Sequence, residues 1–312
     1  DTGVDTAHED LAGRLLPGDN VITGAGAGAG NAADDSANGH GTHVAGIIAA
    51  ETGNGIGIAG TAGTFPVSVL PVKALDANGI GTLYDIAQGI RLSADRGARV
   101  INLSLGARLP DYPVTLAEAV KYAQDRGALV VAAAGNDGDR VEGFYPAALP
   151  GVVSVGASGR DHHPASFSNY GATLMAPGVE ILSTLPGNHY GTLSGTSMAA
   201  PFASGSAALL LSVYPDKGAA DIAEALQSGQ RVYPEGCRTY GWGTVCDNYY
   251  YVLDAQKALG LVIGGSAPYD TLEILQPQED GSRSAHVAGE VGIMAQVSNP
   301  AKVSRVDFTL AD

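Results

Sequence analysis

Three short blocks of the sequence hold side chains that together could perform nucleophilic catalysis. They are Asp-Thr-Gly at residues 1–3, Gly-His-Gly-Thr-His-Val-Ala-Gly at 39–46 and Gly-Thr-Ser-Met-Ala-Ala-Pro at 195–201. A serine hydroxyl is a weak nucleophile until an imidazole accepts its proton, and the imidazole needs a carboxylate that holds its tautomer and stabilises its cation. Asp1, His40 and Ser197 supply these groups in that order. The pattern therefore predicts acyl transfer by an Asp-His-Ser triad.

The order of the blocks and the residues around them resemble the subtilisin-like serine peptidases, the subtilases. The resemblance covers roughly residues 1–260 and includes Ser-Leu-Gly at 104–106, Ala-Ala-Ala-Gly-Asn at 132–136 and Tyr-Pro-Ala-Ala at 145–148. It implies that Asp1 orients the histidine, that His40 is general base and acid, and that Ser197 forms the acyl-enzyme. The Asn136 amide and the Ser197 N–H would stabilise the oxyanion. The resemblance thus implies a serine endopeptidase that needs no cofactor for catalysis.

Two further segments resemble the edge strands between which subtilases hold an extended polypeptide substrate. Pairing of this kind recognises the peptide backbone first and predicts broad sequence preference. The residues concerned are Gly79, Ile80, Gly81, Ser104, Leu105 and Gly106. Ala133, Ala134 and Gly135 would wall the pocket for the residue before the scissile bond, with Phe144 near its base. Phe144 is expected to shorten this pocket and to favour small or medium apolar side chains.

Subtilases often carry structural calcium, and the resemblance extends to residues that would bind it. Asp10, nine residues after Asp1, and Asn54 match positions that supply oxygen ligands, together with the backbone carbonyls of Ile56 and Ile58. Hard oxygen donors on a tight glycine loop suit Ca²⁺. The loop is one residue longer than in the subtilases compared, so the resemblance implies a calcium site here but does not fix its ligands.

Other interpretations of the same residues are weaker. Asp-Thr-Gly also opens the catalytic loop of aspartic peptidases, but those need a second Asp-Ser/Thr-Gly, which this sequence lacks. The glycine pattern at residues 55–60 fits a dinucleotide fingerprint, yet it follows a helix instead of a strand. His40 and His43 have a spacing compatible with a metal, but no third ligand is near. His43 is expected to be a packing residue or to support the residues of the site. The absence of a Gly-x-Ser-x-Gly motif argues against an α/β-hydrolase.

Two functions of another class stay open at this point. One is a catalytically inactive subtilase-like domain that serves as a binding or scaffold module, and the other is an all-β adhesion protein with an accessory peptidase. The joint presence of Asp1, His40, Asn136 and Ser197 argues for an active enzyme.

Alternating strand and helix patterns must position these residues. Strands are expected at residues 67–72, 99–105, 128–134 and 152–157, and helices at 82–94, 116–125, 197–214, 221–226 and 253–259. This alternation predicts an α/β fold of subtilisin type, in which a mainly parallel sheet lies between helices in three layers. Ligands of such sheets bind beyond the carboxyl ends of the strands, which places residues 104–106 and 133–136 at the site.

Composition excludes several classes of protein. The 312 residues are 45% hydrophobic and 16% charged, so they can form a core, and the net charge of −15 disfavours nucleic-acid and membrane-surface partners. No apolar run approaches the ~18–20 residues that a spanning segment needs. Composition therefore predicts no nucleic-acid partner and no membrane span; the resemblance to subtilases implies polypeptide substrates, and a monomer is expected.

The sequence pattern predicts where the domains of the chain begin and end. Residues 1–262 are expected to form the peptidase domain without its first strand, 263–268 a linker, and 269–312 a partial β-sandwich of Ig-like type. Cys237 and Cys246 lie close enough in sequence for a disulfide, with two unpaired buried thiols as the alternative. A disulfide would indicate an extracellular protein. The resemblance also implies an N-terminal pro-segment, and residues 1–312 alone are expected to be poorly active because the strand that would hold Asp1 precedes it.

Overall fold

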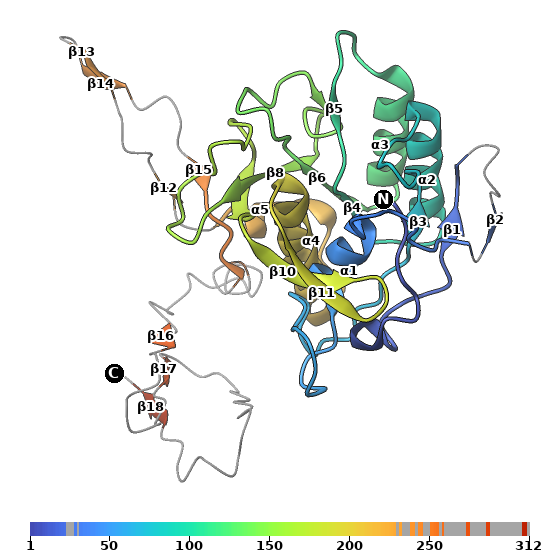
Figure 1. Cartoon of the computed structure of the whole chain (residues 1–312). Coiled ribbons are helices and arrows are strands. Elements are labelled where there is room, and N and C mark those ends of the chain that lie inside the picture. Colours follow the sequence, from blue (N-terminus) through green and yellow to red (C-terminus); the bar gives the residue numbers. More distant parts are fainter. Residues whose placement is uncertain are drawn as a thin grey trace. The chain divides into compact units, whose positions relative to one another are not determined.

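The computed structural model describes residues 1–22, 28–29 and 31–228, and beyond these only residues 231–232, 238–240, 243–245, 250–255, 258, 273–274, 285–287 and 308–310. The chain divides into two compact units, Asp1–Ala258 and Leu259–Asp312. The first unit contains the α/β fold and every predicted catalytic residue (Figure 1).

A four-stranded parallel sheet forms the centre of the first unit. Its strands are β4 (Val100–Leu103), β6 (Leu129–Ala133), β8 (Val153–Ser158) and β9 (Leu174–Pro177), in that order across the sheet. β6 and β8 are buried along their whole length, as their uninterrupted apolar sequences require of strands covered on both faces. The strands predicted at 99–105, 128–134 and 152–157 are thus confirmed.

Helices cover both faces of this sheet, which gives the predicted three layers (Figure 1). They are α1 (His40–Ala49), α2 (Leu83–Asp95), α3 (Val114–Asp125), α4 (Thr196–Val213) and α5 (Ala219–Leu226), with a short 3₁₀ helix, η1, at Glu9–Leu11. Alternate side chains of β4 separate the two faces: Ile101 and Leu103 pack under α2 and α3, whereas Asn102 accepts a hydrogen bond from Ser204 of α4 at 2.8 Å.

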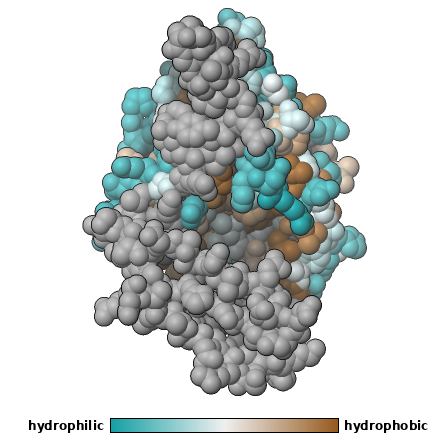
Figure 2. All heavy atoms as spheres, turned by 90° about the vertical axis from the view of Figure 1, so that its left-hand side faces the viewer, coloured by the Kyte–Doolittle hydropathy of each residue, from teal (hydrophilic) through white to brown (hydrophobic). Residues whose placement is uncertain are grey.

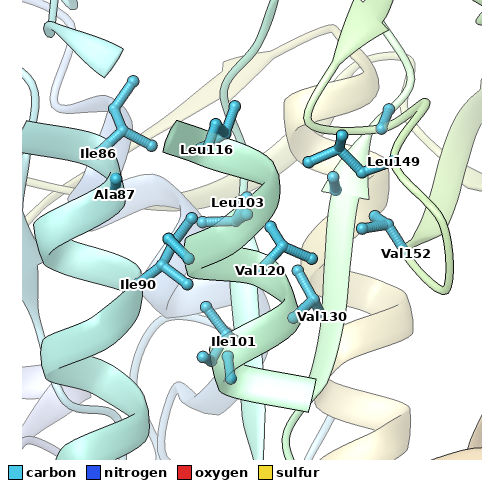
Figure 3. Packing of buried hydrophobic residues seen from close by; sticks show 14 of the residues in the cluster. Ile86, Ala87, Ile90, Ile101, Leu103, Leu116, Val120, Val130, Leu149 and Val152 are labelled. Atoms are coloured by element: carbon cyan, nitrogen blue, oxygen red, sulfur yellow. The ribbon is translucent and has the colours of Figure 1, made fainter. Parts of the chain in front are cut away.

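The face under α2 and α3 contains the largest cluster of buried apolar side chains. Ile86 and Ile90 of α2 meet Leu116 and Val120 of α3 above Val130 of β6 (Figure 3). Both helices end before a glycine in the left-handed region, Gly97 at φ +80° and Gly127 at φ +81°, a conformation that favours glycine after a helix.

On the other face, α4 packs against all four strands and against α1. α4 is also long and apolar enough to cross a membrane by length and composition alone, and it is the one helix of this kind in the described part of the chain. About two thirds of it is buried inside the fold, so α4 is a core helix in this structure.

The predicted strand at residues 67–72 is wrong in extent. Only β3 (Val72–Lys73) forms there, and it pairs in parallel with β1 (Asp19–Asn20), which also pairs with β2 (Gly28–Ala29). Pro71 has no N–H to donate, so this stretch joins the sheet only through separate contacts such as Leu16 N to Val69 O at 2.9 Å.

Among the described residues, four further pairs of short strands form outside the two main sheets. In the first unit they are β5 (Ala107–Arg108) with β7 (Phe144–Tyr145), β10 (Ile181–Leu185) with β11 (His189–Leu193), β12 (Arg231–Val232) with β15 (Tyr250–Tyr251), and β13 (Arg238–Tyr240) with β14 (Gly243–Val245).

A largely apolar, partly open groove of about 570 Å³ lies between β3 and β4, and Asp1 is among the residues that line it.

In the second unit, the described residues form a three-stranded sheet of β16 (Glu273–Ile274), β17 (Ala285–Val287) and β18 (Phe308–Leu310). The predicted linker at 263–268 and most of the predicted module at 269–312 lie outside the described residues. The same holds for residues 256, 257 and 259 of the helix predicted at 253–259 and for both cysteines. These expectations stay predictions.

Candidate active site

Asp1 and His40 meet through a short hydrogen bond. His40 begins α1, and its Nδ1 lies 2.8 Å from Asp1 Oδ1, which also accepts the Thr2 N–H at 2.7 Å. The Asp1 backbone is held beside β3, because its carbonyl accepts the Ala74 N–H at 2.9 Å. A carboxylate at Nδ1 favours the tautomer that carries its proton there and leaves Nε2 free to accept one.

Ser197 and Ser104 join the start of α4 to the end of β4. The Ser104 hydroxyl donates to Ser197 O at 2.7 Å, and the Ser197 hydroxyl donates to Ser104 O at 3.3 Å. Ser197 lies in the first turn of α4, where backbone N–H groups have no partner within the helix. Ser197, His40 and Asn136 line one cleft of about 480 Å³.

The Asn136 amide is oriented by its neighbour in the serine block. Asn136 Oδ1 accepts both the Thr196 N–H at 2.9 Å and the Thr196 hydroxyl at 3.0 Å. Since the oxygen is held by two donors, the amide nitrogen is the group left to donate into the cleft. Thr196, fully buried, also accepts the Gly135 N–H at 3.1 Å. Sequence analysis did not single out Thr196, although it directly precedes Ser197.

The structure brings most of the predicted substrate-binding residues to this cleft, but not all. Those that line it are Gly79, Ser104, Leu105, Gly106, Ala133, Gly135 and Phe144. Ile80 and Gly81 are not among the lining residues, and the Ile80 side chain is 68% exposed. Ala134 is fully buried in the cluster under α2 and α3, because successive residues of an extended segment point to opposite faces. The cleft wall is therefore formed by Ala133 and Gly135.

Phe144 fills the space between the two walls of the cleft. A Cβ on Gly106 would lie 2.4 Å from the Phe144 ring, and one on Gly135 would lie 2.8 Å from it. Gly135 also has φ +104°, a conformation that side chains rarely adopt. The two glycines are needed because the ring packs directly against their backbones.

The residues predicted to bind calcium gather around one buried carboxylate. Asp10 is fully buried, its Oδ1 accepts Asn54 Nδ2 at 2.7 Å, and its Oδ2 accepts the Ile58 N–H at 2.9 Å. A Cβ on Gly57 would lie 2.2 Å from both Asp10 Oδ2 and the buried Tyr190 hydroxyl, and desolvation and the nearby Asp10 carboxylate raise the pKa of Tyr190. Asp10 thus accepts N–H groups of this loop, and the described residues contain no group of three or more His, Cys, Asp or Glu side chains that could hold a metal ion.

Burial sets the protonation state of the catalytic pair. Desolvation lowers the pKa of His40 to about 4, and the Asp34 carboxylate opposes the shift. At neutral pH, His40 is therefore an uncharged base.

A hydroxyl nucleophile, a neutral imidazole oriented by a carboxylate and an amide donor in one cleft define a serine hydrolase of the triad type. The Subtilase family model matches residues 1–243. The chain is 42% identical to thermitase of Thermoactinomyces vulgaris over 73% of this chain and 78% of that protein. The chain therefore belongs to the subtilase family and is a serine endopeptidase of subtilisin type.

Further relatives agree with this assignment. A thermophilic serine proteinase of Bacillus sp. strain AK1 is 50% identical over 68% of this chain, a match that spans about half of that protein (51%). Subtilisin DY of Bacillus licheniformis is 42% identical over 73% of this chain and 80% of its own length. A solved protease structure from Pseudoalteromonas arctica PAMC 21717 superimposes with a TM-score of 0.73 at 33% identity, covering 84% of this chain and 88% of that one.

His43, one turn after His40, is a packing residue. It is fully buried, and its Nε2 lies 3.0 Å from Ile181 O and 3.1 Å from Gly191 O, so the ring holds α1 against the β10–β11 hairpin. Burial lowers the pKa of His43 to about 4.

The free energy of unfolding should decrease as the pH is lowered, because His43 is buried. Between pH 6.5 and about 4 the unfolded chain protonates His43 while the folded chain does not, so the free energy of unfolding falls as pH falls. The shift corresponds to roughly 3 kcal/mol. Urea unfolding at pH 7 and pH 4.5, with Ser197→Ala to stop self-digestion, should show a shallower pH dependence for His43→Gln. The exposed His163→Gln serves as control. Equal slopes for His43→Gln and the parent would contradict this assignment.

Proposed function

We propose that Asp1, His40 and Ser197 hydrolyse peptide bonds through an acyl-enzyme. The observation that carries this proposal is the 2.8 Å contact between His40 Nδ1 and Asp1 Oδ1 beside a cleft that His40 shares with Ser197. Ser197 Oγ attacks the carbonyl carbon as its proton passes to His40 Nε2, and Asp1 stabilises the resulting imidazolium. His40 then returns the proton to the leaving amine. Water repeats the sequence on the ester, which releases the acid and restores the Ser197 hydroxyl.

The oxyanion that forms in each step is proposed to lie between two donors. One is the Asn136 side-chain nitrogen, which the two bonds from Thr196 leave free to donate. The other is the Ser197 N–H in the first turn of α4, where the helix dipole also favours negative charge.

Ser197→Ala should lower the rate of peptide hydrolysis by roughly 10⁴-fold or more, since the nucleophile is gone. It should also abolish labelling by a serine-directed fluorophosphonate. Asn136→Ala should keep the label but lower kcat by ~10²–10³-fold, because the charge on the oxyanion loses a donor. The matched control is Ser194→Ala, whose hydroxyl accepts the Glu180 N–H at 2.9 Å outside the triad.

If the full chain took no label and Ser197→Ala behaved like the parent, the inactive scaffold would be the better interpretation.

We also propose that the substrate is an extended polypeptide whose backbone pairs along the cleft edges, with a short pocket closed by Phe144. The glycines and small residues of the cleft support this, because they let a peptide backbone approach closely. Recognition of this kind makes specificity broad, with small or medium apolar residues favoured before the scissile bond.

Phe144→Leu should open the pocket and raise kcat/KM for substrates with Phe before the scissile bond, relative to Ala, by ~10-fold. A library of peptides that varies only this residue would measure the change. Tyr145→Phe is the control, since Tyr145 stacks edge-on against Tyr112 and does not line the cleft. A parent profile dominated by Lys or Arg would contradict the proposal and implicate Glu142, whose side chain is exposed.

We further propose a structural calcium ion in the Asp10 loop. The proposed donors are hard oxygens: the Asp10 carboxylate, the Asn54 amide oxygen and the carbonyls of Ile56 and Ile58. Binding would require the Asn54 oxygen to leave the Ile56 N–H, from which it accepts a bond at 3.1 Å. The Tyr190 hydroxyl adds a further oxygen beside Asp10. When bound, the ion would brace this loop against η1 and would take no part in bond cleavage.

If calcium binds there, chelation by EGTA should lower the Tm, because a ligand at 100 times its Kd stabilises the folded state by about 2.7 kcal/mol. Asp10→Asn should remove the difference between calcium and EGTA, and Glu9→Gln, an exposed neighbour, should keep it. An identical Tm of the parent in both buffers would rule the ion out.

The remaining proposals concern the whole protein. We propose that it acts outside the cell as a monomer made with a pro-segment, that Cys237 and Cys246 form a disulfide, and that a linker at 263–268 joins the peptidase domain of residues 1–262 to an Ig-like module. The acidic composition and the close spacing of the cysteines support these proposals.

A further inference from the structure

The Asp34 carboxylate receives five hydrogen bonds, from Thr2 near the start of the chain, from Ser36 two residues on, and from Thr42 in the first turn of α1. Oδ1 accepts the Thr2 hydroxyl at 3.0 Å and the Ser36 N–H and hydroxyl at 3.1 and 2.6 Å. Oδ2 accepts the Thr42 N–H at 2.9 Å and the Thr42 hydroxyl at 2.7 Å. These bonds hold the carboxylate ionised and lower the pKa of Asp34 despite its partial burial. None of the motifs in the sequence pointed to this residue.

The same group of side chains caps the helix that carries His40. The residue before α1 is Gly39, which has no side chain to cap it, so the first N–H groups are satisfied from elsewhere. Thr42 N–H donates to Asp34, as above, Gly41 N–H donates to the Thr2 hydroxyl at 2.9 Å, and His40 N–H donates to the Ser36 hydroxyl at 3.3 Å.

Thr2 connects this cap to the carboxylate of the triad. Its hydroxyl donates to Asp34 and accepts from Gly41, while its own N–H donates to Asp1 Oδ1 at 2.7 Å. One end of the network is thus adjacent to Asp1 in the chain, and the other end is the first turn of α1, where His40 lies. Asp34 touches neither the substrate cleft nor the imidazole nitrogens.

We propose that Asp34 is a positioning residue that fixes the Asp1–His40 pair by tying the Thr2 segment to the N-terminus of α1. This inference rests on the proposed function of Asp1 and His40. The negative charge of Asp34 is also matched to the positive end of the α1 dipole.

Several charged groups surround the imidazole that this residue positions. They are the carboxylates of Asp1 and Asp34, the titratable His43 on the same helix, and the Lys73–Asp35 pair at 2.7 Å, in which Lys73 also donates to Thr2 O. Asp34 opposes the lowering of the His40 pKa, so its loss should move the acid limb of the activity profile to lower pH.

Asp34→Asn replaces an acceptor with an NH₂ group that faces donors and removes the charge. We expect kcat per fluorophosphonate-titrated site to fall on the order of 10–100-fold, as for a displaced catalytic group. KM should stay within about twofold, because the cleft is unchanged, and the acid limb of kcat/KM should shift to lower pH. Asp35→Asn is the matched control: it removes the neighbouring charge but contacts only Lys73 among these groups.

Thr2→Val tests the same inference if Asp34→Asn does not fold. It cuts the link between Asp34 and the Thr2 segment but keeps the bonds from Thr42 to Asp34, so it should lower kcat without the full shift in pH. The proposal is overturned if both variants keep the parental kcat per titrated site, or if Asp35→Asn reproduces the loss and the shift of Asp34→Asn. Failure of the parent itself to label would instead overturn the proposed function.

Discussion

The close approach of the first turn of α1 to residues 1–5 is the constraint on which the site depends. A Cβ on Gly41 would lie 2.0 Å from Gly3 O, so only glycine permits this contact. The Asp5 N–H then donates to the Thr42 hydroxyl at 3.0 Å, and His40 meets Asp1 at 2.8 Å. If α1 were displaced by one ångström, the carboxylate would no longer fix the tautomer of the imidazole. The glycines beside His40 are therefore needed to bring its imidazole to the Asp1 carboxylate.

The other half of the site is organised by the parallel sheet. Ser104 and Asn136 follow β4 and β6, whose carboxyl ends lie at one edge because both strands run in the same direction. α4 begins at that edge, and its Thr196 and Ser197 bond to Asn136 and Ser104. The same helix packs across all four strands, so burial of its apolar surface also holds the nucleophile in place. Stability and catalytic geometry thus depend on one packed interface.

The sequence predicted the parts of this arrangement that follow from local pattern. Long apolar strands such as β6 and the nucleophile at the start of α4 have local signals, and the structure has them where expected. The strand predicted at 67–72 was too long because its β-branched residues were given more weight than Pro71. Ala134 was expected in the pocket, although the alternation of side chains along a strand places it in the core. Asp34 and Thr196 were missed because their roles arise from contacts between distant segments, which no spacing in the sequence reveals.

His40 and His43 show why residue type and spacing alone could not decide function. They lie on one helix, and burial lowers the pKa of both rings to about 4. His40 has a carboxylate at Nδ1 and faces a cleft, so its neutral form can accept a proton and its cation is stabilised once formed. His43 faces two carbonyls through Nε2, and its buried Nδ1 has no partner, so its cation has no carboxylate to stabilise it. The same desolvation therefore produces a general base at one position and an acid-sensitive packing contact at the other, and the difference lies in the partner atoms that the fold supplies.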